Sequence, residues 1–201
     1  MKTFKFNIHT AIMAALVLVS TLGFTSCDDD DNKTPQPTPS LSQLNGEYTG
    51  KMTFTTLEKE GEEENSGTDI TATVKNDTIY FNDFPVKDII TSIVGEENSE
   101  AIIEAIGKVE YKIGYKAEMN EDKTEATMKL DPKPLTLQFS LTEETVTNIE
   151  VSVSATNNNG SYTFLTKDMK FEITADEVKV NDEVFPRFKK SLFNFIMNNG
   201  K

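Results

Sequence analysis

The chain has 201 residues, of which 37% are hydrophobic, and this is enough for one domain with a substantial core. Its formal net charge is −13, and no run of Lys or Arg with interleaved aromatic residues offsets that charge along the sequence. Because so acidic a surface repels phosphate backbones, nucleic acid is excluded as an expected partner.

Residues 1–26 have the organisation of a signal peptide. Lys2 and Lys5 precede a short apolar run, and two small residues stand directly before Cys27. A membrane-spanning helix needs about 20 apolar residues, and this run is shorter. The segment is therefore expected to direct export and then to be removed.

The motif LGFTSC, which ends at Cys27, resembles a bacterial lipobox, although Phe24 stands where leucine is usual. The resemblance implies that the Cys27 sulfur carries diacylglycerol and that the acyl chains anchor the protein to a membrane, with no other cofactor. The alternative is an ordinary cleaved signal with a leftover thiol.

The DDDD sequence after the cysteine resembles the export signal that sends lipoproteins of the Bacteroides group to the outer face of the outer membrane. Its alternative is a solvated spacer. Residues 27–44 form the expected tether, in which prolines at alternate positions favour an extended chain. The residues of the export signal are Asp28, Asp29, Asp30 and Asp31.

Residues 45–201 form the expected folded domain, because hydrophobic and polar residues alternate there with a period of two. This period is typical of strands with one dry face, and it predicts nine or ten strands. Asn-Gly near residue 160 predicts a tight hairpin that pairs 149–155 with 161–165. The clearest strand patterns are GEYTGKMTFTT at 46–56, TDITATV at 68–74, KVEYKIGYKAEM at 108–119, PLTLQFSL at 134–141 and NIEVSVSA at 148–155.

Three segments have helical spacing instead. Residues 86–94 follow a proline and precede a glycine, and residues 99–106 also end at a glycine. A C-terminal helix is expected after Pro186. The residues that share one face of that helix are Phe188, Leu192, Phe195 and Ile196.

The first and third of these segments follow similar sequences. TIYFNDFPVKDIITSIV and VKVNDEVFPRFKKSLFNFI both read as a strand, Asn-Asp, Phe-Pro and a helix. Two related halves, 45–107 and 108–201, are one interpretation of this similarity. Chance is the other, because Asn-Asp is common in turns and proline is common at helix starts.

Together these elements predict an α+β fold that is mainly antiparallel β. Two arrangements stay open: a lipocalin-like barrel with a helix across its mouth, or curved sheets packed on the helices. The chain resembles a family of uncharacterised surface lipoproteins of the Bacteroides group, described as lipocalin-like or calycin-like. The resemblance rests on LGFTSCDDDD, LNGEYTGKM and FNDFPVKDII, and Tyr48 stands where lipocalins usually have tryptophan.

The mature chain lacks side chains that many catalytic and metal sites need. His9, the only histidine, lies in the signal peptide, and Cys27 is the only cysteine. Ser-His-Asp and Cys-His mechanisms and Cys/His zinc sites are thereby excluded, and no spacing singles out a pair of carboxylates. The acidic stretches do not match a calcium-binding loop, so we expect neither a metal site nor an enzyme.

The expected function is that of a non-catalytic, surface-exposed outer-membrane lipoprotein that binds or presents a ligand, for example a small apolar molecule inside a barrel. The alternatives are a structural or adhesin component of an envelope protein complex, and a glycan-binding accessory lipoprotein with Tyr80 and Tyr162 facing outward. Thr78, in the sequence DTI, resembles the acceptor of Bacteroides O-glycosylation. The oligomeric state stays open. The residues expected to line an apolar ligand are Tyr48, Met52, Phe54, Tyr111, Tyr115 and Phe139.

Overall fold

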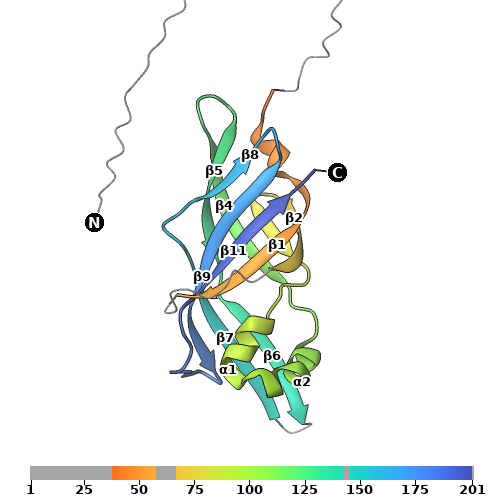
Figure 1. The fold of residues 1–201 in the computed structure, drawn as a ribbon, viewed down its shortest axis with the longest axis vertical. Coiled ribbons are helices and arrows are strands. Elements are labelled where there is room, and N and C mark those ends of the chain that lie inside the picture. Colours follow the sequence, from red (N-terminus) through yellow and green to blue (C-terminus); the bar gives the residue numbers. More distant parts are fainter. Residues whose placement is uncertain (1–37, 58–66, 143–144, 201) are drawn as a thin grey trace, which may run out of the picture. The chain divides into compact units, whose positions relative to one another are not determined.

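Eight antiparallel strands close into a barrel in the computed structural model, which describes residues 38–57, 67–142 and 145–200 (Figure 1). The strands are β1 (Gly46–Thr56), β2 (Thr68–Lys75), β3 (Thr78–Phe81), β4 (Tyr111–Met119), β5 (Glu125–Pro132), β8 (Gly160–Thr163), β9 (Asp168–Val180) and β11 (Ser191–Asn198). They follow one another around the barrel in the order β11, β1, β2, β3, β4, β5, β8 and β9, and β9 then pairs with β11. The predicted fold class, mainly antiparallel β, is confirmed in its barrel form.

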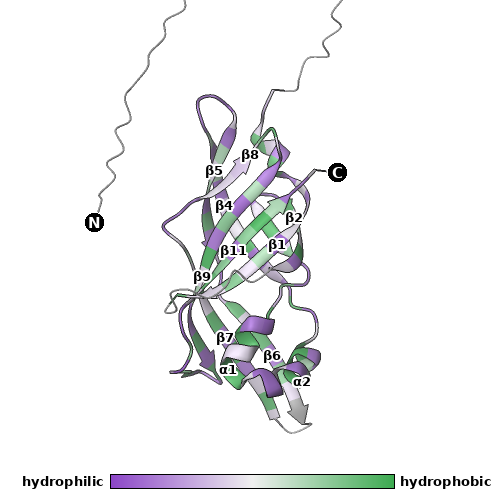
Figure 2. Cartoon of the chain, viewed as in Figure 1, coloured by the Kyte–Doolittle hydropathy of each residue, from purple (hydrophilic) through white to green (hydrophobic). Residues whose placement is uncertain are grey.

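Alternating side chains explain why these strands enclose a core. In β4, Tyr111, Ile113 and Tyr115 are buried, whereas Lys112 and Lys116, at the alternate positions, are exposed. Figure 2 shows hydrophobic and hydrophilic segments alternating along the barrel strands. Because successive side chains of a strand point to opposite faces, one face fills the barrel and the other meets water. Closure also removes the unpaired strand edges that promote aggregation.

A hairpin and two helices lie at one end of the barrel. The hairpin strands β6 (Leu135–Thr142) and β7 (Thr145–Ala155) pair with each other, and β7 pairs with the second half of β9. Helices α1 (Lys87–Val94) and α2 (Glu96–Ile106) contact each other, and α2 also contacts β6. The short strand β10 (Glu183–Val184) pairs with the end of β9. The helices and the hairpin thus form a second, smaller layer beside the barrel end.

A β-bulge allows β9 to pair with strands of the barrel and with the hairpin of the second layer. Its ladder with β7 changes register between Ser152 and Val153. Before the bulge, Ile173 pairs with Phe193 of β11 as part of the barrel, and after it Val178 pairs with β7. A bulge bends a strand and increases its twist, so this one redirects β9 out of the barrel.

The two helices form close to where the sequence predicts them, although α2 begins three residues earlier than the predicted 99–106. Gly95 separates the helices with φ of +80°, a backbone conformation that favours glycine. Glu96 and Glu97 occupy the first turn of α2, where the positive end of the helix dipole favours acidic side chains. These two glutamates account for the earlier start.

A short 3₁₀ helix, η1 (Leu41–Leu44), closes the other end of the barrel, which we call the mouth. Ser40 and Gln43 form a capping box at its start, and the Leu44 side chain is buried. The Tyr48 hydroxyl donates a hydrogen bond of 2.8 Å to the Leu44 carbonyl oxygen. The compact unit therefore begins at Thr38, and residues 38–44, which the sequence assigned to the tether, belong to the fold.

The predicted C-terminal helix is wrong, because the segment forms strand β11. The core side chains of Phe193, Phe195 and Met197 are buried, and Ile196 is 51% exposed. Helical spacing had grouped Phe195 with Ile196, whereas the observed burial follows a period of two. Pairing with both β1 and β9 decides the outcome, since the barrel closes only if this segment is extended.

The predicted hairpin between residues 149–155 and 161–165 is also wrong. β7 pairs with β6 and β9, while β8 pairs with β5 and β9. The tight hairpin instead joins β8 to β9 through residues 164–167, where Lys167 has φ of +59°. Asn-Gly lies at the end of the segment that connects β7 to β8, and Gly160 is the first residue of β8.

The two similar sequences, 78–94 and 178–196, do not form similar structures. Asn181 and Asp182 have positive φ and form the tight turn between β9 and β10, whereas Asn82 and Asp83 do not have positive φ. A helix follows the first Phe-Pro, and β11 follows the second. The two segments therefore have different structures, which favours chance over two related halves.

Candidate binding face

Aromatic side chains occupy the interior of the barrel. Phe195 stacks on Phe171 with ring centroids 4.5 Å apart, and Phe84 lies edge-on to Tyr111 at 4.9 Å and to Phe193 at 5.7 Å. An eight-stranded barrel has an interior just wide enough for side chains to fill it. Phe84 packs across the end near the helices, and Leu44 closes the mouth. The interior is thus a packed core among the described residues.

The residues expected to line an apolar ligand do not form one group. Tyr48, Met52, Tyr111 and Tyr115 are buried in barrel strands. The partly buried Phe54 lies near the end of β1, with its ring 5.1 Å from that of Phe193. The other predicted residue, Phe139, is buried on β6 in the helix layer. Ligand binding by these residues stays a prediction.

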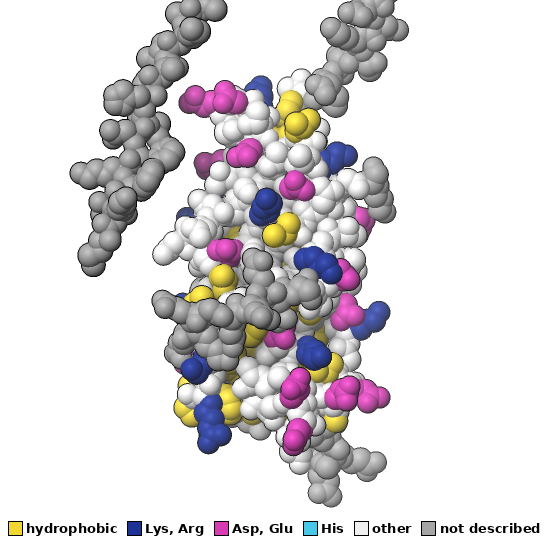
Figure 3. All heavy atoms as spheres, in the orientation of Figure 1, with side chains coloured by type: hydrophobic (Ala, Val, Ile, Leu, Met, Phe, Trp, Pro, Cys, Tyr) yellow, Lys and Arg dark blue, Asp and Glu magenta, His cyan; other side chains and the backbone are white. Residues whose placement is uncertain are grey.

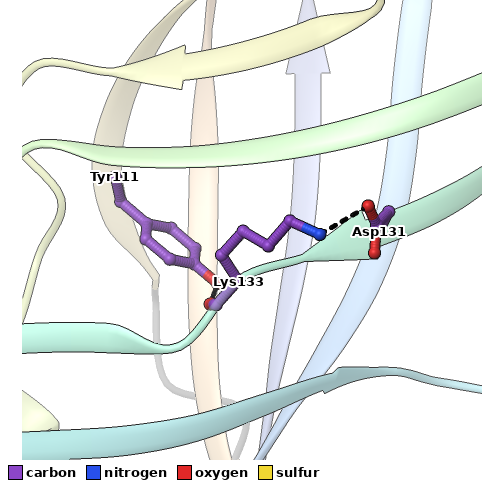
Figure 4. Close-up of polar contacts among 3 residues, drawn as sticks. All are labelled: Tyr111, Asp131 and Lys133. Atoms are coloured by element: carbon purple, nitrogen blue, oxygen red, sulfur yellow. Dashed lines mark hydrogen bonds and ion pairs between the residues drawn. The ribbon is translucent and has the colours of Figure 1, made fainter.

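Burial also governs the chemistry of the interior tyrosines. It raises the pKa of the Tyr48 and Tyr111 hydroxyls above their ordinary range, and burial with a smaller contribution from Asp77 raises the pKa of Tyr115 to about 12. The Tyr111 hydroxyl donates a hydrogen bond of 2.6 Å to the Lys133 carbonyl oxygen (Figure 4). The Tyr48 and Tyr111 hydroxyls are therefore neutral hydrogen-bond donors that link barrel strands to the adjoining segments.

The outer face of β2–β5 gathers basic side chains that are scattered along the sequence. Lysines of β2, β4 and β5, and Lys133 just after β5, lie on the same outer face as the half-buried ring of Tyr80 on β3. We call this surface the lysine face, and its residues are Lys75, Tyr80, Lys112, Gly114, Lys116, Lys129 and Lys133. It lies across the barrel from β9 and β11, whose side, seen in Figure 3, carries basic and acidic side chains interspersed. The outer face of β2–β5 also carries Asp69, Glu118, Glu125 and Asp131, so lysines predominate only around Tyr80.

Tyr80 organises the centre of the lysine face. The Lys75 ammonium nitrogen lies 5.0 Å from the centroid of the Tyr80 ring, and that of Lys112 lies 5.6 Å from it. Both distances are within the range of a cation–π interaction. The ring thus holds two ammonium groups in place without neutralising them, and this lowers the entropy that a ligand would lose by ordering them.

Strand register sets the size and shape of the lysine face. Lys116 lies directly opposite Lys129, an arrangement of like charges that destabilises a sheet. Gly114 leaves a gap beside them, because it has no side chain and lies opposite Asp131. From strand spacing and rise, the face measures about 14 Å across four strands and about 13 Å along β4.

A hollow of about 360 Å³ opens at one edge of the lysine face. Lys112, Lys133 and the apolar Pro134 and Leu135 contribute to its lining, together with Tyr111, Glu110 and Thr136. Asp131 lies within the face, and its carboxylate pairs with the Lys133 ammonium at 2.7 Å (Figure 4). Both partners are largely exposed, so this ion pair is weak and is open to exchange for an incoming anion.

The sequence does not show this face directly, since its lysines lie up to 58 positions apart, from Lys75 to Lys133. The sequence does place these lysines at the polar positions of segments in which hydrophobic and polar residues alternate. Their grouping, however, depends on which strands are neighbours in the barrel. Of the tyrosines expected to face outward, Tyr80 does so in part, whereas Tyr162 is buried with 1% exposure. The Tyr162 prediction is wrong because its ring packs against Phe164 at 5.2 Å and its hydroxyl bonds to η1.

The remaining predicted sites are placed as follows. Thr78 begins β3 beside the lysine face, where its hydroxyl donates to the Asn76 carbonyl oxygen. Cys27 and the aspartates at 28–31 lie outside the described residues. Within the part of the chain that the structure describes, no three His, Cys, Asp or Glu side chains are placed to share a metal ion. Among those same residues, no helix is long and apolar enough to cross a membrane.

Residues 43–180 match the family model of a domain of unknown function, DUF4840. The chain belongs to this family. The matched residues run from η1 to the end of β9, so the DUF4840 match includes seven of the eight barrel strands and the helix layer, and it ends before β11. Comparison with curated proteins and with solved structures gave no match.

Proposed function

We propose that this DUF4840 protein is a lipid-anchored, non-catalytic binding module at the outer surface of a Bacteroides-type outer membrane, and that its lysine face binds an acidic polysaccharide. The anchoring rests on the sequence. Cys27 follows a signal-peptide pattern in a lipobox-like motif, and four aspartates come next. Two or three acyl chains on one cysteine would give stable attachment, which a single chain does not.

The binding part of the proposal rests on one observation: Tyr80 holds two lysine ammonium groups at the centre of a basic face. Lysines that remain positively charged next to one another favour a negatively charged ligand. Because each exposed charge contact contributes only about 0.2–1 kcal/mol, useful affinity requires several contacts at once. A polymer with repeated carboxylate or sulfate groups supplies them, and neighbouring repeats add avidity.

The outer face is a better candidate than the barrel interior. An apolar ligand inside the barrel would have to displace rings that already contact one another, such as those of Phe171 and Phe195. The net charge of −13 repels a long nucleic acid and an acidic polysaccharide alike, so the hollow beside the lysine face, rather than charge, favours the polysaccharide. The sugar rings of a polysaccharide would also pack against the exposed Pro134 in the adjoining hollow.

Binding of a sulfated polysaccharide by purified mature protein tests this proposal. We expect dextran sulfate to bind, and uncharged dextran not to bind, with an affinity that falls as salt screens the charges. The double substitution Lys75→Gln and Lys112→Gln should weaken binding about tenfold, since each contact contributes roughly 0.7 kcal/mol, or about threefold in Kd.

A matched control separates a specific face from general attraction. Lys170→Gln with Lys179→Gln removes the same charge from β9, away from the lysine face. This control should change the affinity by less than about twofold, because these lysines would not contact the polymer. Equal losses in the two double variants, or equal binding of charged and uncharged dextran, would show that the lysine face is not the site.

A further inference from the structure

Large apolar side chains are exposed at the mouth of the barrel. Leu165, in the turn between β8 and β9, is 85% exposed, and Leu41 of η1 is 38% exposed. Other large hydrophobic side chains that are exposed in the described residues reach at most 52% exposure, so Leu165 stands apart. A leucine at the tip of a turn makes few packing contacts within the protein, so its side chain is available to a partner.

Leu41 and Leu165 both lie at the mouth, Leu41 on the side of β4, where it lines a hollow with Tyr115 and Lys116. The Tyr162 hydroxyl donates a hydrogen bond of 3.1 Å to the Gln43 carbonyl oxygen, which connects η1 to β8. Phe164, next to Leu165, packs its ring against that of Tyr162. Figure 3 shows hydrophobic side chains on the surface at the barrel end where the described chain begins. We call Leu41, Phe164 and Leu165 the apolar tip.

The sequence places the proposed lipid anchor close to this tip. Cys27 and Thr38, the first residue of the compact unit, are separated only by residues 28–37. Ten residues span at most about 35 Å, even when fully extended. The chain enters the fold at η1, so the mouth is the end of the barrel that the anchor would hold nearest to the membrane.

We infer that the apolar tip inserts into the membrane interface, so that the barrel stands with its mouth against the lipid. This inference rests on the lipid anchor proposed above. Lys167 lies in the same turn as Leu165 and can reach lipid phosphates, as amphipathic surface anchors do. Glu121 and Asp122, in the turn between β4 and β5, also lie at the mouth and would be repelled by an anionic surface.

This orientation also supports the proposed function. The lysine face lies along the side of the barrel, and the helix layer lies at the end opposite the mouth. A barrel that stands on its mouth therefore leaves the lysine face open to polymers outside the cell, whereas a barrel lying on β3 and β4 would cover it.

A single tryptophan tests the inference directly, because the chain contains none. We would place it by Leu165→Trp in the full lipidated protein and reconstitute the protein in phosphatidylethanolamine–phosphatidylglycerol vesicles with brominated acyl chains. The control is Val184→Trp in β10, which also replaces an exposed hydrophobic residue. Val184 pairs with the end of β9 that lies away from the mouth. The tryptophan at 165 should show blue-shifted emission and at least about twice the bromine quenching of the one at 184.

The outcomes separate the anchor from the orientation. If the protein floats with the vesicles but both tryptophans are quenched equally, the inference fails and the anchor stands. If the full protein, after export and processing, stays in the aqueous fraction, both the anchor and the inference fail. Stronger quenching at 184 than at 165 would mean that the barrel approaches the membrane by its helix end, which also overturns the inference.

Discussion

At the scale of single residues, a glycine permits the closest approach between two barrel strands. Gly50 of β1 points toward β11, and a Cβ atom added there would overlap the Ile196 carbonyl oxygen and lie 2.6 Å from Met197 Cα. Both of these are backbone atoms of a strand that is paired on both sides, so they cannot move aside easily. The absence of a side chain at position 50 therefore allows β1 and β11 to pair.

Substitution Gly50→Ala should destabilise the barrel by about 2–4 kcal/mol, because the added methyl group forces two paired strands apart. Urea unfolding followed by circular dichroism measures this loss. Gly114→Ala is the matched control, since its Cβ would lie 3.6 Å from the nearest atom, at ordinary contact distance. Equal stability of the two variants would show that the approach of β1 to β11 is not tight.

At the scale of elements, β11 shows how tertiary pairing overrides local sequence pattern. Its residues fit a helical spacing and a strand spacing equally well on hydrophobicity alone. Phe195 is buried in both interpretations, and Ile196 is buried only in the helical one. The strand forms because β1 and β9 each offer it a row of unsatisfied backbone hydrogen-bonding groups, and long-range pairing satisfies both rows.

The substitutions Phe195→Ala and Ile196→Ala distinguish the two interpretations in solution. Phe195 is fully buried and stacks on Phe171, so its truncation should lower the free energy of unfolding by about 3–5 kcal/mol. Ile196 points outward, and its truncation should cost less than about 0.5 kcal/mol. Thermal unfolding of both variants measures the difference, and a large loss in Ile196→Ala would contradict the strand.

Local patterns predicted most elements because they depend on neighbours in sequence. The alternation in 46–56 and 108–119 and the proline and glycine signals around α1 and α2 were sufficient. Strand neighbours were not predictable in the same way, since β5 pairs with β8 across the intervening hairpin β6–β7. The lysine face was missed for this reason, because it exists only once β2, β3, β4 and β5 are adjacent.

At the scale of the whole molecule, different parts of the surface differ in charge and in exposed hydrophobic residues. The helix end is acidic in the first turn of α2, the side formed by β2–β5 is basic around Tyr80, and the mouth exposes Leu165. Most of the surface charge needs no ligand to explain it, because net charge alone keeps a protein soluble. The two proposals assign a polysaccharide to the lysine face and a lipid surface to the apolar tip.

Alkaline pH should destabilise the barrel, because its buried tyrosines resist ionisation. Tyr115 has a pKa of about 12 in the folded protein, against an ordinary value of 10.0, and the pKa values of Tyr48 and Tyr111 are also raised by burial. Between these values the unfolded chain releases protons that the folded chain keeps, so stability falls as pH rises. Below about pH 10 these groups are protonated in both states and their contribution is fully present.

The test is to measure urea unfolding at steps from about pH 9 to pH 12 in the parent protein and in Tyr115→Phe. Phenylalanine cannot ionise, so the variant should lose less stability over this range than the parent does. Lysine deprotonation occurs in the same interval but is common to both proteins, and the comparison removes it. If both proteins lost stability equally, Tyr115 would not be linked to folding, and the tyrosines at the mouth would be more open to water than their burial implies.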